Sequence, residues 1–287
     1  MTESQWRSDL LDLDAYLSRI GYAGPRAATP EVLRALHRAH LAAIAFENLD
    51  VILGRGVAVD LPSVQAKLVD AGRGGYCYEH GTLFAAALEQ MGFSVDRLLV
   101  RTGDPLVEPR PRTHLTLKVT NGDGPWLADV GFGSGLLEPV PLRSSPPLRQ
   151  GAWQYRLTLG PDGAWRLAED DGTGWRTLQT ITEEPVYPID VERANWTTST
   201  HPHSPFVNRI ICVRKDDRQV QRLLGRTYSV ERPGRPAVVR DLDDGTFAVT
   251  VRREFGLDLT EDDIAALLSF NWPEAAAGLT ASPARRP

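Results

Sequence analysis

Cys77, His114 and Asp129 are residues whose side chains can together carry out nucleophilic catalysis. A neutral thiol is a weak nucleophile, so an enzyme that uses cysteine must favour the thiolate. A nearby imidazole can take the thiol proton, and a carboxylate can hold that imidazole in the required tautomer and stabilise its charged form. We therefore expect Cys77 to be the nucleophile, with His114 as its base and Asp129 as the orienting carboxylate.

The chain around Cys77 predicts that this residue begins a helix. Residues 61–71 have the pattern of a short helix, and the glycines at 72, 74 and 75 interrupt it. Between residues 78 and 91 the apolar side chains follow helical spacing, and Gly92 supplies the expected stop. The amino terminus of a helix carries partial positive charge, which favours a thiolate.

His114 and Asp129 are predicted to lie on the two strands of a hairpin. From 114 to 119 apolar and polar side chains alternate, which is typical of a strand. A second strand over 126–130 follows the turn sequence NGDG at 121–124. Such a hairpin brings Asp129 back toward His114. The order Cys, His, Asp resembles that of papain-like enzymes, although such triads recur on unrelated folds.

Other polar candidates have plainer interpretations. A lone cysteine near glycines is commonly a small buried residue, and Cys212 lies in an apolar run that indicates a core position. His37 and His40 lie one helical turn apart, and His201 and His203 flank a proline. Neither pair has a convincing third ligand, so we predict no metal site.

The rest of the chain mixes helices and strands. Helices are expected over 10–20, over 30–44 and from about residue 260, and strands over 155–159 and 165–167. Two further strand-like runs, 238–241 and 247–251, flank the turn sequence DDG at 243–245, and the end from 273 to 287 is expected to be frayed.

Composition describes an ordinary globular protein. The chain has 287 residues, of which 42% are hydrophobic and 24% charged, and its net charge is -5. A negative net charge gives no general attraction for phosphate backbones, so nucleic acid is not expected as a partner. No apolar run approaches the length of a membrane span, and no signal peptide is evident, so we expect a cytoplasmic protein with two free thiols.

Several motifs together carry a family resemblance. The sequence contains RGGYCYEH at 73–80, TH at 113–114 and DVGFG at 129–133, and also FENL at 46–49, STHP at 199–202 and Phe206. These motifs resemble those of the arylamine N-acetyltransferases, in particular the bacterial, actinomycete-like members. The matches span positions 46 to 206, and the order of the elements fits along the whole chain.

The resemblance implies an α+β fold with a helical bundle, a β-barrel and an α/β lid around a cysteine-protease-like catalytic core. It suggests a helical domain over 1–92 that carries the nucleophile, a barrel domain over 93–200 that carries His114 and Asp129, and a lid domain over 201–287. It also implies acetyl-CoA as co-substrate, an aromatic amine or hydrazine as acceptor, and a ping-pong mechanism through acetyl-cysteine.

The same resemblance suggests a set of residues for binding substrate or CoA. These residues are Phe46, Arg73, Thr113, Gly131, Phe132 and Phe206. Without the resemblance, an isolated phenylalanine is ordinarily a core residue, and an arginine beside glycines is commonly a solvated turn residue. Arg73 could instead fix the loop before Cys77 electrostatically.

Alternatives remain open at this level. A related acyl or amide synthase would use the same triad to move a larger acyl chain, a hydrolase would admit water to the thioester, and a catalytically silent binding protein would keep only the fold. Ala45 stands where Pro often precedes the FENL motif, and Gly81 where Asn often follows His80. The physiological acceptor, the acyl chain and the oligomeric state, which could be a homo-oligomer, are not determined by the sequence.

Overall fold

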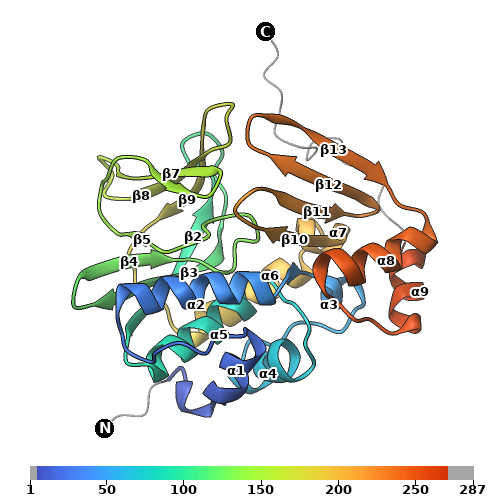
Figure 1. Cartoon of the computed structure of the whole chain (residues 1–287), viewed down its shortest axis with the longest axis horizontal. Helices are drawn as coiled ribbons and strands as arrows, with labels where there is room; N and C mark the ends of the chain where they lie inside the picture. Colours follow the sequence, from blue (N-terminus) through green and yellow to red (C-terminus); the bar gives the residue numbers. More distant parts are fainter. Residues whose placement is uncertain (1–4, 271–287) are drawn as a thin grey trace.

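The computed structural model describes residues 5–270 and has the predicted α+β fold (Figure 1). The first third is helical. Its elements are η1 (Ser8–Leu10), α1 (Leu13–Arg19), α2 (Pro30–Ala43), α3 (Leu49–Ile52), α4 (Leu61–Gln65), the π-helical η2 (Ala66–Asp70) and α5 (Cys77–Gln90).

Helix α2 begins where its sequence predicts. Thr29 precedes it, and the Thr29 hydroxyl accepts a hydrogen bond from the Val32 amide, while Pro30 occupies the first helical position. Leu33 and Leu36 are fully buried on the face that packs against the rest of the bundle. The amphipathic pattern therefore fixes which face of α2 looks inward.

The middle of the chain forms one eight-stranded antiparallel sheet that curls into a half-barrel (Figure 1). Its strands are β2 (Ser94–Thr102), β3 (Arg112–Asn121), β4 (Gly124–Ala128), β5 (Val140–Pro141), β6 (Leu148–Gln150), β7 (Trp153–Leu159), β8 (Trp165–Asp170) and β9 (Trp175–Ile181). The spatial order is β5-β4-β3-β2-β9-β8-β7-β6. The predicted hairpin is present as β3 and β4, with Leu117 opposite Ala128.

The last third adds a second sheet with helices beside it. Its elements are α6 (Pro188–Thr200), α7 (Pro205–Asn208), β10 (Ile211–Lys215), β11 (Val220–Leu224), β12 (Thr227–Arg232), β13 (Arg235–Asp241), α8 (Asp244–Phe255) and α9 (Glu261–Ser269). The five-stranded order is β1-β10-β11-β12-β13, in which β1 (Phe46–Glu47) comes from the helical third of the chain. The second sheet thus combines a strand from the first third of the chain with strands from the last third.

Helix α5 is the central element of the bundle, because nearly all of its residues are buried. Phe84 and Leu88 lie in the same core as the inward residues of α2. On its other side α5 packs against β2 and β3, where Gly81 approaches Leu115 so closely that a Cβ would lie 2.7 Å from the leucine Cδ2. The helix that begins with Cys77 is therefore held rigidly between bundle and sheet.

One sequence expectation was wrong. Residues 247–251 form part of helix α8 and are not a strand. Asp243 caps this helix by accepting a hydrogen bond from the Thr246 amide, and Phe247, Val251 and Phe255 recur at helical spacing on its buried face. The expected fraying of residues 273–287 lies outside the described residues. Within 5–270 no helix is long and apolar enough to cross a bilayer.

Candidate active site

Cys77 is the first residue of α5 and is 3% exposed. The amide of Tyr76, just before the helix, donates a 2.9 Å hydrogen bond to the Glu79 carboxylate. This bond satisfies a free amide at the helix terminus and fixes the backbone leading into Cys77. The Cys77 thiol lies 3.8 Å from the carbonyl oxygen of Thr113, on the neighbouring strand β3.

The two glycines before Tyr76 allow a close approach of neighbouring groups. A Cβ on Gly75 would lie 2.7 Å from a carboxylate oxygen of Glu79, and one on Gly74 would overlap the backbone of Ala45. Neither glycine has a positive φ, so the requirement is for space and not for backbone freedom. The GG pair of the motif is therefore explained by the tight path of this loop behind the thiol.

His114 and Asp129 meet as the hairpin predicts. His114 is on β3, and Asp129 directly follows the last residue of β4. The Nε2 atom of His114 lies 2.7 Å from Oδ2 of Asp129. Because Asp129 engages Nε2, the nitrogen left for the Cys77 thiol is Nδ1.

The charges of this pair favour an ion pair at neutral pH. Burial opposes the charged imidazole, but the Asp129 carboxylate and the Cys77 side chain outweigh it and raise the pKa of His114 to about 10. Burial likewise disfavours the carboxylate, yet the imidazole and the hydrogen bonds from Gln179 and Gly131 lower the pKa of Asp129. His114 is therefore protonated and Asp129 ionised over the physiological range.

Two further residues hold Asp129, and sequence analysis missed both of these roles. The Gln179 amide on β9 donates to the same Oδ2 atom that faces His114. His37 on α2 accepts a 3.1 Å hydrogen bond from the Asp129 amide, and its Nδ1 lies 3.0 Å from the carbonyl oxygen of Leu137. Burial lowers the pKa of His37 to about 4, so its ring is neutral and can accept this bond. The histidine considered above as part of a metal pair is thus committed to hydrogen bonds.

Aromatic rings lie beside the imidazole of His114 and beside Tyr76, the residue before Cys77. Phe132 meets His114 edge to face with ring centroids 5.2 Å apart. Phe46 and Phe206 are 6.2 Å apart, and Phe206 also contacts Tyr76 at 5.5 Å. These residues come from the loop after β4, from β1 and from α7, so the fold brings together side chains that are distant in sequence. Their role in binding a substrate stays a prediction.

Thr113 and Gly131 lie close to Cys77, Thr113 through its carbonyl oxygen near the thiol and Gly131 beside the Cys77 backbone. The Thr113 carbonyl also accepts a 2.8 Å hydrogen bond from the Tyr78 hydroxyl. The Gly131 amide donates to Asp129 Oδ1 at 3.0 Å, and a Cβ on Gly131 would lie 2.9 Å from the Cα and carbonyl oxygen of Cys77. The loop after β4 therefore contacts the backbone of Cys77 directly.

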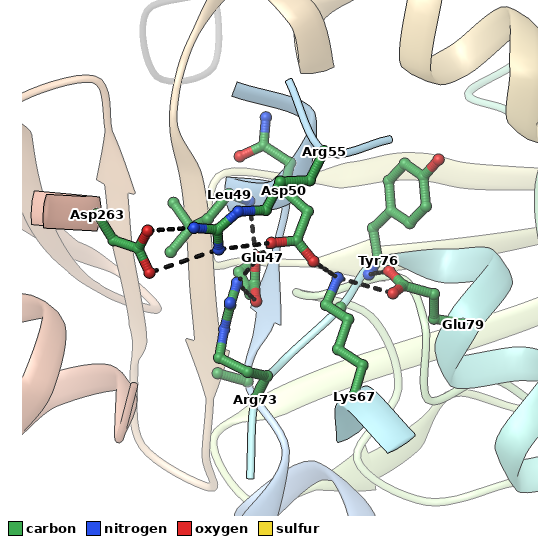
Figure 2. A network of polar contacts seen from close by, with 12 residues as sticks. Glu47, Leu49, Asp50, Arg55, Lys67, Arg73, Tyr76, Glu79 and Asp263 are labelled. Carbon is green, nitrogen blue, oxygen red and sulfur yellow. Dashed lines mark hydrogen bonds and ion pairs between the residues drawn. The ribbon is translucent and has the colours of Figure 1, made fainter. Parts of the chain in front are cut away.

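Arg73 belongs to a network of buried charges beside the loop that precedes Cys77 (Figure 2). Its Nη2 lies 2.8 Å from Glu47 Oε1 and 3.3 Å from Asp50 Oδ1, and its side chain is 12% exposed. The structure thus shows Arg73 holding the loop before Cys77 to β1 and α3. Its assignment to substrate or CoA binding stays a prediction. In the described part of the chain, no group of three or more His, Cys, Asp or Glu side chains is arranged to hold a metal ion.

Known proteins share both sequence and structure with the chain. A family model described as N-acetyltransferase matches residues 29–264. The arylamine N-acetyltransferase of Mycolicibacterium smegmatis is 38% identical over 257 residues, which cover 87% of this chain and 93% of that relative. The crystal structure of the Nocardia farcinica arylamine N-acetyltransferase is 42% identical with a TM-score of 0.87, and the match covers 93% of this chain and 96% of that one.

A third relative has been solved with a ligand. The Mycobacterium marinum arylamine N-acetyltransferase in complex with CoA is 32% identical with a TM-score of 0.82, and the match covers 89% of this chain and 98% of that one. Sequence and fold point to the same group of proteins. The chain belongs to the arylamine N-acetyltransferase family.

Proposed function

We propose that this protein transfers an acetyl group from acetyl-CoA to an aromatic amine or hydrazine, through an acetyl group carried on Cys77. The observation that supports this most directly is the buried contact between His114 and Asp129, 2.7 Å apart, beside a cysteine at a helix terminus. A cysteine paired with a protonated histidine is a poised nucleophile rather than an inert core residue.

In the first half of the proposed reaction, the Cys77 thiolate attacks the carbonyl carbon of the thioester. A carbon–sulfur bond forms to Cys77, and the tetrahedral intermediate collapses by breaking the bond to the CoA sulfur. His114 is protonated at neutral pH because its pKa is raised to about 10, so it can give its Nδ1 proton to the departing CoA thiolate. The products are acetyl-Cys77, CoA thiol and a neutral imidazole.

In the second half, the nitrogen of the amine attacks the acetyl carbon on Cys77. The neutral His114 accepts the proton that this nitrogen loses, and the bond to the Cys77 sulfur breaks to regenerate the thiolate. Asp129 stabilises the imidazolium that forms again, while Gln179 holds the carboxylate in place. The CoA complex of the Mycobacterium marinum relative supports a CoA thioester as the donor.

Transfer to an amine rather than to water requires that water be kept from the acetyl-enzyme. Cys77 is 3% exposed, and aromatic rings contact its neighbours, since Phe132 meets His114 and Phe206 meets Tyr76. An apolar surrounding of this kind favours an aromatic acceptor over a water molecule.

Intact-mass spectrometry tests the proposal directly. Acetyl-CoA without acceptor should add one acetyl group to the wild-type protein, and a subsequent aromatic amine should remove it as the acetylated amine. Cys77→Ser should show neither step while its thermal unfolding matches wild type, whereas Cys212→Ala should retain both, because Cys212 is fully buried in the second sheet. An unmodified wild-type protein, or acetylation that persists in Cys77→Ser, would refute the proposal. A panel of longer acyl-CoA donors distinguishes acetyl transfer from transfer of larger chains.

A further inference from the structure

A network of buried charges lies beside the loop that precedes Cys77 and joins α5 to the rest of the bundle (Figure 2). Lys67 of η2 is its centre, since its Nζ lies 2.8 Å from Asp50 Oδ2 and 2.7 Å from Glu79 Oε1. Arg73 joins Glu47 to the same Asp50. The side chains of Glu47 and Glu79 are 0% and 2% exposed, so these are desolvated charges and not surface pairs.

Glu79 uses its two oxygens for different partners. Oε1 accepts from Lys67 at 2.7 Å, and Oε2 accepts from the Tyr76 amide at 2.9 Å. Gly75 leaves room for this carboxylate, because a Cβ there would lie 2.7 Å from Oε2. The Glu79 carboxylate therefore connects Lys67 to the peptide that directly precedes Cys77.

We propose that Glu79, kept ionised by Lys67, is a positioning residue for the acylation of Cys77, and that protonation of Glu79 releases the Tyr76 amide and lowers the reactivity of the thiol. The inference rests on the proposed function, in which Cys77 is the nucleophile. It assigns to Lys67 and Glu79 a part in the reaction although neither touches the substrate.

The charges around Glu79 make its protonation depend on Lys67. Burial raises the pKa of Glu79 to about 7, Lys67 counteracts this rise, and Glu47 of β1 adds to it. Asp50 of α3 and Arg73 of the preceding loop lie beyond them, bound to Lys67 and Glu47. Removing Lys67 leaves Glu79 facing burial and a second carboxylate, so its pKa must rise further.

Protonation weakens the contact that holds the loop. An ionised carboxylate accepts a stronger hydrogen bond than a neutral acid does, and only the ion attracts the Lys67 ammonium. As pH falls through about 7, the Tyr76 amide should lose its charged partner, and the start of α5 should loosen. The placement of the thiol relative to His114 is then less well defined, and misplacement by a fraction of an ångström slows a reaction that depends on alignment.

The test compares pH profiles of Cys77 reactivity in five proteins. These are wild type, Lys67→Met, Lys67→Arg, Glu79→Gln and the matched control Lys118→Met, which removes a lysine that pairs with Glu183 on the barrel surface. Two rates are measured for each protein between about pH 5.5 and about pH 9: acetylation by acetyl-CoA, followed by intact mass, and alkylation by iodoacetamide, followed by peptide mass at Cys77.

Each variant has a distinct expected profile. In wild type and Lys118→Met both rates should decrease below about pH 7, with a limiting slope of about tenfold per pH unit. In Lys67→Met this acid limb should move upward by at least about one pH unit, so that the rate is about tenfold lower near pH 7 and recovers near pH 9. Lys67→Arg should restore the wild-type limb. Glu79→Gln should remove it and keep the rate near the low value of protonated Glu79 at every pH, because the neutral amide does not titrate and does not attract the Lys67 ammonium.

Other outcomes overturn the inference. A Lys67→Met protein that is slower by the same factor at every pH would show a structural role only, and an acid limb that persists in Glu79→Gln would assign the titration to another group. If Lys67→Met does not fold, the Glu79→Gln profile alone decides between these results. Failure of wild type to acetylate would refute the proposed function, whereas the alkylation profiles would still support or overturn the role of Glu79.

Discussion

Replacement of Gly131 by alanine tests whether the contact between the loop after β4 and the start of α5 governs activity. An ideal Cβ at this position would lie 2.9 Å from both the Cα and the carbonyl oxygen of Cys77. Both are backbone atoms at the start of a buried helix, so they cannot rotate aside as a flexible side chain could. The loop that carries Asp129 must therefore move relative to Cys77.

The geometry sets the size of the effect. An ordinary Cβ contact begins at 3.4 Å, so relief of the overlap requires a displacement of about half an ångström. Overpacking of this kind costs about 1–3 kcal/mol of unfolding free energy. A misplacement of about 1 Å at a reacting group costs about a hundredfold in rate, so the smaller shift should lower kcat/KM by about tenfold or more.

The assay compares two alanine variants. Gly131→Ala and Gly122→Ala are measured for kcat/KM with acetyl-CoA and an aromatic amine, and for unfolding in urea. Gly122 lies in the hairpin turn with no atom within 4 Å of an added Cβ, so its variant should match wild type in both measurements. Equal kcat/KM and equal unfolding midpoints for the two variants would show that the close approach of Gly131 to Cys77 does not constrain the site.

Three further predictions follow from the same structure. Asp129→Asn should lower the acylation rate by about ten-thousandfold, because the imidazole loses the carboxylate that orients and charges it; a stopped-flow rate near wild type would remove Asp129 from the mechanism. Phe84→Ala should lower the free energy of unfolding by about 3–5 kcal/mol, since this fully buried ring of α5 packs against α2, and urea denaturation measures this loss. The pKa of His114 is raised to about 10, so the stabilisation from its charged form is complete below its ordinary value of 6.5 and is lost as pH rises through about 10. Raising the pH from 7 to 10 should therefore lower the free energy of unfolding of wild type more than that of His114→Gln. Urea denaturation at each pH measures this, and equal slopes of unfolding free energy against pH would contradict the prediction.

The placement of Cys77, His114 and Asp129 on a helix start and a hairpin could be predicted from sequence because the signals are local. Glycine stops and helical spacing define α5, and alternation with a turn sequence defines the β3–β4 hairpin. The family resemblance gave the expected arrangement of the larger parts, and the solved relatives confirm the α+β fold. Local sequence signals are therefore enough to predict a helix or a hairpin whose conformation is determined by its own short segment.

Helix α6 (Pro188–Thr200) shows where local signals fail. It is rich in threonine, and few of its residues are buried, so no amphipathic stripe marks it in the sequence. Contacts distant in sequence support it instead: Asn195 binds the hydroxyl of Tyr76, and Thr198 binds that of Tyr78 at 3.0 Å. The helix propensities of single residues do not include such tertiary stabilisation, so they do not predict this helix.

The residues that hold Asp129 could not be predicted for a related reason. His37 and Gln179 approach it from α2 and from β9, far along the chain on either side. Hydrogen bonds between distant elements leave no pattern in a single sequence. The wrong strand at 247–251 is different, because Phe247 and Val251 fit either an alternating or a helical pattern, and only the Asp243 cap favoured the helix.

The pairing of β1 with β10 has a consequence for how the protein is made. Phe46 lies opposite Val213, and Glu47 opposite Cys212, so a strand from the early chain finds its partner only after most of the polypeptide has left the ribosome. Pairings of such large sequence separation are slow, because loop closure precedes the gain in contacts. Since Glu47 also holds Arg73 next to the Cys77 loop, Cys77 cannot reach its final setting in a nascent chain that ends before β10. The folding of this enzyme thus couples its earliest strand to the last third of the chain, and a truncated translation product should carry Cys77 without the surroundings that it has in the complete fold.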